Sequence, residues 1–391
     1  MSIISKKKKI LFLPKWYPNY LDMSDGLFIE DHAKAVGIKN DVFLLFIHSS
    51  DQIEGKRAVE FDDTKGFKEL KIYFKSVKTG IGFLDKLFTG LRYLSVQFAG
   101  YQRVKEVWGE PDICHVHVLL RTSFLARRLK RKKNIPYVIS EHWSGYDPAV
   151  GSPITGFKRK QLQKSLRKSS GVTAVSDYLM EHLKQIYKHD NTQVIANAIN
   201  EEIFTYKEKQ TKEIKRFLHI STLSSDPKNF DLILKTMAEL TQKRSDFVLD
   251  VVGEGVEMDE QIALAKELGV YGETVLFHGY LEKEDVATKF HQSDLFVLFS
   301  RNETQSCVLL ESFLTGTPAI VPNVGGAKEL IADYNGKLVE RNDSKQLLQL
   351  LNSFLNDEFT FDHKRMSDEA LQFGYKNIGN QFDSLYNDIL S

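Results

Sequence analysis

The chain has 391 residues, enough for two domains that each bury a core, and its 42% hydrophobic and 27% charged residues exclude a disordered protein. The two cysteines, Cys114 and Cys307, are too few for a disulfide framework, which favours a reducing compartment. The net charge of +1 is unevenly spread, because residues 1–200 carry +13 and residues 201–391 carry −12. This asymmetry suggests two bodies with different partners.

The sequence contains no apolar stretch that approaches the ~20 residues of a membrane-spanning helix. The chain begins with four lysines at 6–9 and an apolar run, but that run stops at Pro14, which is too early for a secretory signal peptide. We therefore expect a cytoplasmic protein, at most peripheral on the inner face of the cell membrane.

Short apolar runs alternate with amphipathic stretches along the whole chain. In the first half, strands are predicted at 10–14, 41–48, 70–74, 113–118, 137–142, 171–176 and 192–197, and helices at 27–37, 85–107, 121–133, 157–169 and 177–188. In the second half, strands are predicted at 217–222, 247–253, 275–280, 295–300, 319–322 and 337–339, and helices at 229–243, 257–268, 283–292, 306–315, 325–332 and 343–356.

Apolar strands that alternate with helices predict parallel sheets covered on both faces, and two such sets predict two doubly wound α/β domains. The charged segment 201–215 has few apolar residues and reads as a linker. We expect an N-terminal domain at 1–203, a C-terminal domain at 204–370 and a final helix at 371–391 that packs back towards the N-terminal domain. Ligands of this architecture bind outside the carboxyl ends of the strands.

The segment 300–330 carries the clearest chemistry. Glu303 follows a predicted buried strand, and the backbone amides of Gln305, Ser306 and Cys307 open the next helix. A helix start offers N–H groups and a positive dipole end, which together favour an anion such as a diphosphate. Glu303 before the helix and Glu311 within it add carboxylates that can accept hydrogen bonds from sugar hydroxyls.

Two further patterns narrow the range of ligands. Gly253 and Gly255 follow a predicted strand but lack the third glycine of a dinucleotide fingerprint, so we interpret them as a tight turn near a nucleobase. The histidines are not spaced as a metal cluster and no paired aspartate motif is present, so we expect no metal site and no cofactor.

The basic stretches 121–134 and 158–168 have apolar residues at helical spacing. Cationic amphipathic helices suit contact with an anionic membrane surface. A plain solvated helix face stays open as the alternative. No aromatic-rich basic platform of the kind that stacks bases is evident, so nucleic acid is not an expected partner.

Together these segments resemble the retaining glycosyltransferases with the GT-B fold, family four, also called group 1. Glu303 and Glu311 are separated by seven residues, and Gly316-Thr-Pro318 and Gly325-Gly326 follow. The other resembling segments, in the family's order, are WYPNYLDMSDGLFIEDHAKAV, HVHV, SEHW, GVTAVSDYL, VIANAIN and VVGEGVE. The resemblance covers nearly the whole chain. It implies two Rossmann-like domains that face each other across a cleft.

The resemblance also implies site roles. Glu311 would hold the donor ribose, Glu303 would contact hydroxyls of the transferred sugar, and Lys228 would neutralise the leaving diphosphate. His117 would line the donor–acceptor cleft, and Gly26 would let backbone approach the donor phosphate. Glu303, Lys228 and His117 are thus the expected catalytic residues.

The expected donor-binding set consists of residues from both halves of the chain, namely Gly26, Lys228, Gly253, Glu303, Gln305, Ser306, Cys307 and Glu311. His142 is expected on the acceptor side, and capping of its own strand stays open as a simpler role. One position departs from the family: an arginine usually precedes the lysine by six positions, where this chain has Thr222. Arg301, Lys328 or a basic side chain of the N-terminal domain would then compensate, or Lys228 and the helix amides hold the phosphate.

The implied activity is transfer of a hexosyl group from a nucleotide-sugar to a glycan or lipid-linked acceptor, in polysaccharide or lipopolysaccharide assembly. Two alternatives stay open. One is a sugar-nucleotide epimerase on the same fold, which would need no acceptor. The other is a non-catalytic membrane-associated protein, which only Thr222 favours.

Overall fold

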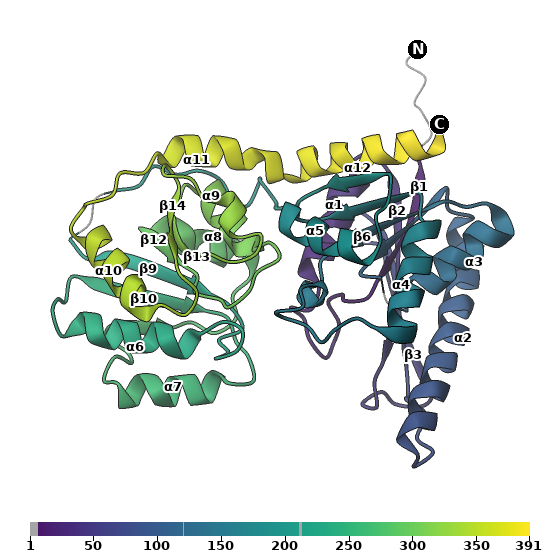
Figure 1. Ribbon diagram of the computed structural model, residues 1–391, viewed down its shortest axis with the longest axis horizontal. Helices are drawn as coiled ribbons and strands as arrows, with labels where there is room; N and C mark the ends of the chain where they lie inside the picture. Colours follow the sequence, from purple (N-terminus) through teal and green to yellow (C-terminus); the bar gives the residue numbers. More distant parts are fainter. Residues whose placement is uncertain (1–6, 120, 211–212) are drawn as a thin grey trace. The chain divides into compact units, whose positions relative to one another are not determined.

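The computed structural model describes residues 7–119, 121–210 and 213–391, and the chain divides into two compact units. Unit 1 holds the described residues up to Ala198 together with Tyr375–Ser391, and unit 2 is Ile199–Gly374 (Figure 1). The expected boundaries after 203 and 370 differ from these by five and four residues.

The expected linker at 201–215 does not lie where the chain passes between the units, and its described part belongs to unit 2. Phe204 is buried in the core of that unit. The Lys209 ammonium donates hydrogen bonds to the carbonyls of Phe290 and Ser293, at 2.7 and 2.8 Å, and to Thr317 Oγ1 at 2.8 Å. Composition misled here because a charged residue that satisfies buried carbonyls looks like a solvated one in sequence. Residues 211–212 lie outside the described residues.

The sheet of unit 1 has eight strands in the order β3-β4-β2-β1-β5-β6-β7-β8, parallel except for β3. The strands are β1 (Lys9–Pro14), β2 (Asp41–Ser49), β3 (Arg57–Asp62), β4 (Lys68–Phe74), β5 (Ile113–His117), β6 (Tyr137–Glu141), β7 (Gly171–Ala174) and β8 (Thr192–Val194). The antiparallel edge strand β3 was not predicted, because most of its residues are exposed and it lacks an apolar run.

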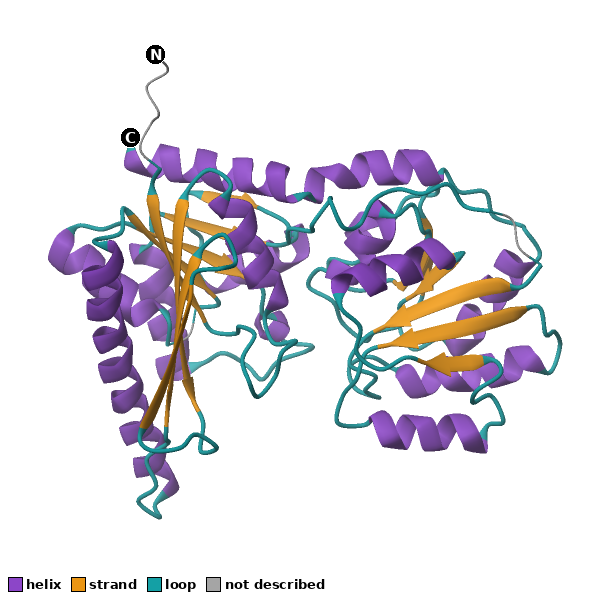
Figure 2. Ribbon diagram, turned by 180° about the vertical axis from the view of Figure 1, so that it is seen from behind, coloured by secondary structure: helices purple, strands orange, loops and turns teal. Residues whose placement is uncertain are grey.

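Helices cover both faces of this sheet (Figure 2). They are α1 (Leu27–Gly37), α2 (Gly82–Trp108), α3 (Ser123–Lys133), α4 (Gly156–Lys168), α5 (Asp177–Ile186) and α12 (Tyr375–Leu390), with a short 3-10 turn η1 (Ser144–Tyr146). Alternate residues of β1 enter different cores: Leu11 packs with α2–α5, and Phe12 packs with α1 and α12. The last helix, α12, lies on α1, where a side chain at Gly379 would meet the Ala35 carbonyl oxygen at 2.3 Å.

Unit 2 has six parallel strands in the order β11-β10-β9-β12-β13-β14. They are β9 (Lys215–Ile220), β10 (Phe247–Val252), β11 (Val275–Phe277), β12 (Leu295–Val297), β13 (Ala319–Pro322) and β14 (Gly336–Val339). The helices are α6 (Phe230–Thr241), α7 (Met258–Glu267), α8 (Lys283–Gln292), α9 (Cys307–Leu314), α10 (Ser344–Leu355) and α11 (His363–Ala370), with 3-10 turns η2 (Lys328–Leu330) and η3 (Leu371–Phe373). The expected helix at 325–332 is only the turn η2.

Both units are doubly wound α/β folds, which confirms the predicted fold class. In unit 1 the chain builds outwards from β1 to β2 and then returns to β5 on the other side of β1. In unit 2 it builds outwards from β9 and returns to β12 on the other side of β9. Each sheet therefore has one topological switch point, and ligands of such sheets bind there, outside the carboxyl ends of the strands. Among the described helices, none combines the length and apolar character needed to cross a membrane.

Candidate functional site

The switch point of unit 2 brings Lys228 and Glu303 together. Lys228 lies in the loop after β9, and Glu303 lies in the loop after β12, the strand that pairs with β9. Lys228 Nζ is 2.8 Å from Glu303 Oε1, and both side chains are partly buried. Two residues that are 75 positions apart in sequence thus form one ion pair. The pair lies where a doubly wound sheet binds its ligand.

The Lys228 loop is held by its neighbour Asn229. Asn229 takes a left-handed backbone conformation, with φ of 53°, at the start of α6. Its side-chain amide donates to the Phe299 carbonyl at 3.0 Å and to Asn342 Oδ1 at 2.8 Å, and both partners follow other strands of the sheet. The loop is therefore anchored across the carboxyl edge, which fixes the path of the backbone that carries Lys228.

The Glu303 loop is held by the glycine pair Gly325-Gly326. Gly325 has φ of 52°, and a side chain there would lie 1.9 Å from the Glu303 carbonyl oxygen. The Gly326 N–H donates to the same oxygen at 2.9 Å. Only glycine fits at 325, so this part of the sequence motif positions Glu303 through its backbone.

Helix α9 begins directly after the Glu303 loop. Its N-cap residue, Ser306, has an extended conformation, and its side chain makes no capping hydrogen bond. Gln305 and Ser306 are buried, while Cys307 and Glu311 are half-buried. The start of such a helix is suited to an anion, because its first backbone amides and the positive end of its dipole point in the same direction.

Gly253 and Gly255 pack the loop after β10 against the loop after β9. A side chain at Gly253 would lie 2.0 Å from the Ser221 carbonyl oxygen, and one at Gly255 would lie 2.1 Å from that of Thr222. These glycines are needed for loop packing whatever ligand binds nearby. The contact with a nucleobase stays a prediction.

Arg301 lies against the Lys228 loop, the same loop in which Thr222 stands where the family usually has an arginine. Its Nε donates to Asn229 Oδ1 at 2.7 Å, and its Nη1 lies 3.6 Å from an Asp226 carboxylate oxygen. Its backbone N–H donates to the Pro227 carbonyl at 2.7 Å. Of the compensating cations considered from the sequence, Arg301 is thus tied directly to the loop that holds Lys228.

At the switch point of unit 1, Gly26 precedes α1 with φ of 69°. A side chain at Gly26 would lie 2.5 Å from the Trp16 carbonyl carbon, in the loop after β1. The close approach seen here is to the chain's own backbone, so Gly26 is needed for folding. Its contact with a donor phosphate stays a prediction.

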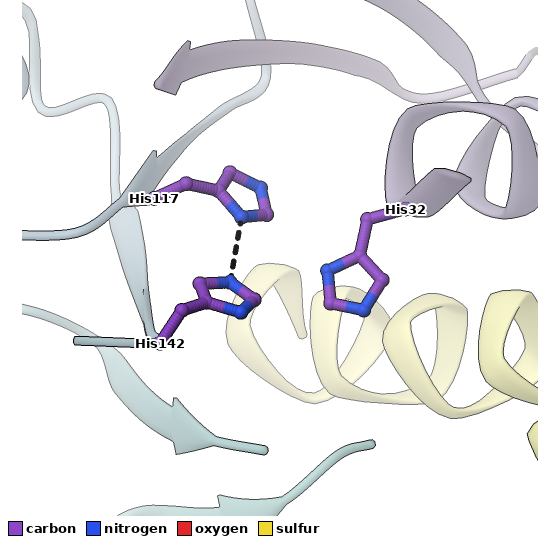
Figure 3. A group of neighbouring side chains, drawn as sticks. All are labelled: His32, His117 and His142. Atoms are coloured by element: carbon purple, nitrogen blue, oxygen red, sulfur yellow. Dashed lines mark hydrogen bonds between the residues drawn. The ribbon is translucent and has the colours of Figure 1, made fainter. Parts of the chain in front are cut away.

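His117 and His142 lie together at the same edge, and His32 of α1 joins them (Figure 3). His117 Nδ1 lies 3.3 Å from His142 Nε2, and each of the three rings offers a nitrogen within 4.8 Å of the others. Of the groups in the described part of the chain, this one could hold a metal ion. The expectation of no metal site rested on sequence spacing, which could not reveal it, because the three histidines come from distant segments.

All three imidazoles are buried, and burial lowers their pKa values: that of His32 to about 4, and those of His117 and His142 well below the usual range. His32 Nε2 lies 3.0 Å from the Ala196 carbonyl, which only accepts, so this nitrogen carries the proton. Its Nδ1 is buried and meets no hydrogen-bond partner. The cluster is therefore neutral. Since His117 and His142 are buried, their contacts with donor or acceptor stay predictions.

Glu141, which precedes His142, was not singled out in the sequence. It is buried, and its Oε1 accepts hydrogen bonds from the Leu119 N–H at 2.7 Å and the Tyr146 hydroxyl at 2.8 Å. Burial raises its pKa to about 7. No sequence pattern distinguishes this carboxylate from an exposed one.

Two family models match adjacent parts of the chain. The model described as "Glycosyl transferases group 1" matches residues 200–373, and the model described as "Glycosyltransferase Family 4" matches residues 64–203. The first match contains the whole Lys228–Glu303 site, and the second contains His117 and His142.

Individual relatives agree with these models. The N-acetyl-alpha-D-glucosaminyl L-malate synthase of Bacillus anthracis is 28% identical over 302 residues, which cover 71% of this chain and 75% of the relative. Among solved structures, HepE of Anabaena in complex with UDP has a TM-score of 0.70 at 19% identity and covers 97% of this chain and 100% of its own. The lipopolysaccharide outer core galactosyltransferase WaaB has a TM-score of 0.67 at 17% identity, with 97% and 99% covered. The fold is therefore that of the GT-B glycosyltransferases.

Proposed function

From the premise that this chain belongs to the group 1 glycosyl transferases and is a transferase enzyme, we propose that it moves a hexosyl group from a nucleotide-sugar donor to a glycan or lipid-linked acceptor, with retention of anomeric configuration. The observation that carries this proposal is the Lys228–Glu303 pair at the switch point of unit 2. A cation and a hydrogen-bond-accepting carboxylate 2.8 Å apart, beside the start of α9, match the two ends of a sugar diphosphate.

In this proposal the donor diphosphate lies against the first amides of α9 and Lys228. Glu303 accepts hydrogen bonds from hydroxyls of the transferred sugar, and Glu311 accepts those of the ribose. Because Lys228 is already paired with Glu303, donor binding would give the lysine a second anionic partner. Arg301, which is tied to the same loop, supplies the positive charge that Thr222 lacks.

The proposed reaction takes place on one face of the sugar. The bond between the anomeric carbon and the diphosphate oxygen breaks, and a bond to the acceptor oxygen forms on the same face. The acceptor hydroxyl proton passes to a diphosphate oxygen. Negative charge grows on the leaving diphosphate during this step, and Lys228 and the dipole of α9 stabilise it where it develops. Since both are parts of the protein, we expect donor binding to persist in EDTA.

Two similarities support the choice of substrates. HepE is solved with UDP, and WaaB is named as a lipopolysaccharide galactosyltransferase. We propose a donor of the UDP-sugar class and a step in cell-surface polysaccharide or lipopolysaccharide assembly. A lipid-linked acceptor places the protein at the inner face of the cell membrane, which agrees with the basic stretches 121–134 and 158–168.

A thermal-shift screen of UDP-, GDP- and ADP-sugars tests the proposal. A donor at 100 times its Kd stabilises the fold by about 2.7 kcal/mol through mass action. One of these three classes of nucleotide-sugar should raise the melting temperature of the wild type. It should not raise that of Glu311→Ala, which loses the ribose contact. Lack of stabilisation by every class would contradict the proposal. Conversion of the bound donor without any acceptor would indicate an epimerase instead.

A further inference from the structure

Helix α2 of unit 1 carries a second apolar face, which lies outside the core except at Leu94, a half-buried residue that packs against the core. Its core side holds a stripe of buried residues, namely Tyr93, Val96, Tyr101 and Val104. The other stripe consists of Phe83, Leu87, Leu91, Leu94 and Phe98, spaced by four, four, three and four residues, so it follows one side of the helix. Phe83 is 74% exposed and Leu91 is 54% exposed. A contiguous exposed apolar stripe of this length marks an interaction site.

The neighbouring helices α3 and α4 make this surface strongly basic. Figure 1 shows both helices beside α2 on the same face of the sheet of unit 1. Within their bounds they contain twelve basic side chains and no acidic one. The basic residues are Arg127, Arg128, Lys130, Arg131, Lys132, Lys133, Lys158, Arg159, Lys160, Lys164, Arg167 and Lys168.

A hollow of about 450 Å³ joins the apolar stripe to the basic helices. Leu94 and Phe98 of the stripe line it, together with Arg131 of α3 and Lys164 and Lys168 of α4. Phe98 carries the Arg128 guanidinium 4.8 Å above its ring. A second hollow of about 600 Å³ reaches the highly exposed Phe157 at the start of α4. Apolar side chains and cations therefore alternate across one continuous surface.

We propose that this surface, the exposed stripe of α2 with the basic helices α3 and α4, docks unit 1 on a bilayer of anionic phospholipid. The stripe lies at the boundary between headgroups and acyl chains, and the lysines and arginines bind the phosphates around it. Burial of apolar side chains and attraction to anionic lipid act together in peripheral helices of this kind. The basic helices were expected to contact a membrane, but the sequence gave α2 no such role.

The charge of the surface argues against a second copy of the chain as its occupant. A symmetric dimer would place this patch against itself, so the cations of α3 and α4 that line the two hollows in each copy would face those of the other, namely Arg127, Arg128, Arg131, Lys158, Lys164 and Lys168. A phospholipid surface offers the opposite charge and an apolar interior in the same layer. The inference takes its membrane location from the proposed function, but it does not require the transfer reaction.

The test is co-sedimentation of the full chain with vesicles of phosphatidylcholine alone or of phosphatidylcholine mixed with phosphatidylglycerol, an anionic lipid that gives the vesicle a negative surface potential. Phe83→Gln with Leu91→Gln removes the stripe, and Arg131→Glu with Lys168→Glu reverses two charges. The matched controls change exposed residues of unit 2 outside the proposed donor site: Leu371→Gln with Ile214→Gln, and Lys243→Glu with Lys345→Glu.

We expect the wild type and both controls to bind the anionic vesicles, and each test variant to bind about tenfold more weakly. Raised salt should release the wild type. Equal binding to neutral vesicles, no binding at all, or unchanged binding of both test variants would overturn the proposal. A wild-type dimer that the stripe variant abolishes would assign the surface to a second copy instead. Thermal shift with the donor should be the same in all five proteins, so failure to bind any donor would refute the proposed function alone.

Discussion

The two switch points occupy the same position in two doubly wound sheets, yet the side chains at them differ in charge and in exposure to solvent. In unit 2 the loops after β9 and β12 carry a lysine and a glutamate that pair at 2.8 Å and stay partly exposed. In unit 1 the corresponding edge carries three histidines that are buried and held neutral. The fold provides the place, and the residues that follow the strands decide whether it is suited to an anion.

The net charge of each half of the chain does not indicate which kind of ligand site that half contains. The half of the chain from residue 201 carries −12, but it contains the anion-suited site. Residues 1–200 carry +13, and twelve of their basic side chains lie close together on α3 and α4 rather than at the histidine cluster. Net charge therefore describes the surface and its partners, whereas a ligand site depends on a few local groups.

The largest expected effect is on catalysis, and it distinguishes the Lys228–Glu303 ion pair from an ordinary surface ion pair. Lys228→Ala should lower kcat/KM by about 10²–10³, because one preorganised positive charge at a developing oxyanion is lost. The free energy of unfolding should change by less than about 1 kcal/mol, because the pair is partly exposed. Lys235→Ala, which breaks the exposed Lys235–Asp231 pair in the same unit, is the control and should keep full activity. Equal effects of the two variants would remove the special role of Lys228.

The glycine that holds the Glu303 loop gives the next largest effect. Gly325→Ala should lower the free energy of unfolding by about 3 kcal/mol, because it combines a positive φ with a contact at 1.9 Å from the Glu303 carbonyl oxygen. Gly279→Ala has a similar φ of 68° but no atom within 4 Å, so it should cost only about 1 kcal/mol. Chemical denaturation measures both, and equal costs would show that the close approach is not what restricts Gly325.

Glu141, which precedes His142 at the carboxyl edge of the sheet of unit 1, should make the free energy of unfolding depend on pH. Its pKa is raised to about 7 in the fold, so its contribution to stability is present at low pH and is lost as pH rises through 7. The loss between pH 5 and 8 amounts to about 3 kcal/mol at most. Glu141→Gln keeps an acceptor for the Leu119 N–H and should remove this loss. The same slope of unfolding free energy with pH in both proteins would contradict the prediction.

His32 should give a smaller effect with the opposite sign. Its pKa is lowered to about 4, so its contribution is present above pH 6.5 and is lost as pH falls towards 4. Between pH 7 and 5 the loss is about 2 kcal/mol. His32→Gln can still donate to the Ala196 carbonyl and should lose less stability over this interval. Chemical denaturation of both proteins at pH 7 and pH 5 measures this loss of stability. An equal or larger loss in the variant would show that His32 is not held neutral by burial.

Much of the fold could be predicted from the sequence, because apolar strands and amphipathic helices alternate with clear periods. Edge strand β3 could not, since its residues RAVEFD form no apolar run and most of them are exposed, apolar Val59 and Phe61 included. The segment 201–210 was misread because Lys209 serves buried carbonyls while looking like a solvated charge.

For the site, Glu303 and Lys228 could be named because spacing and family resemblance both indicate them. The partnership of His32 with His117 and His142 depends on three separate segments meeting at one edge, and the sequence alone does not carry that information. The left-handed Gly325 could be named as part of a motif, but its contact with the Glu303 backbone needed the structure.

Titration calorimetry of a UDP-sugar against the wild type, Glu311→Ala and His117→Ala tests the central claim most directly, namely that the donor nucleotide binds at the switch point of unit 2. We predict that Glu311→Ala abolishes donor binding, whereas His117→Ala leaves it within about threefold, less than the 1.4 kcal/mol that corresponds to a tenfold change in affinity. Unchanged donor affinity in Glu311→Ala would contradict the assignment of the site.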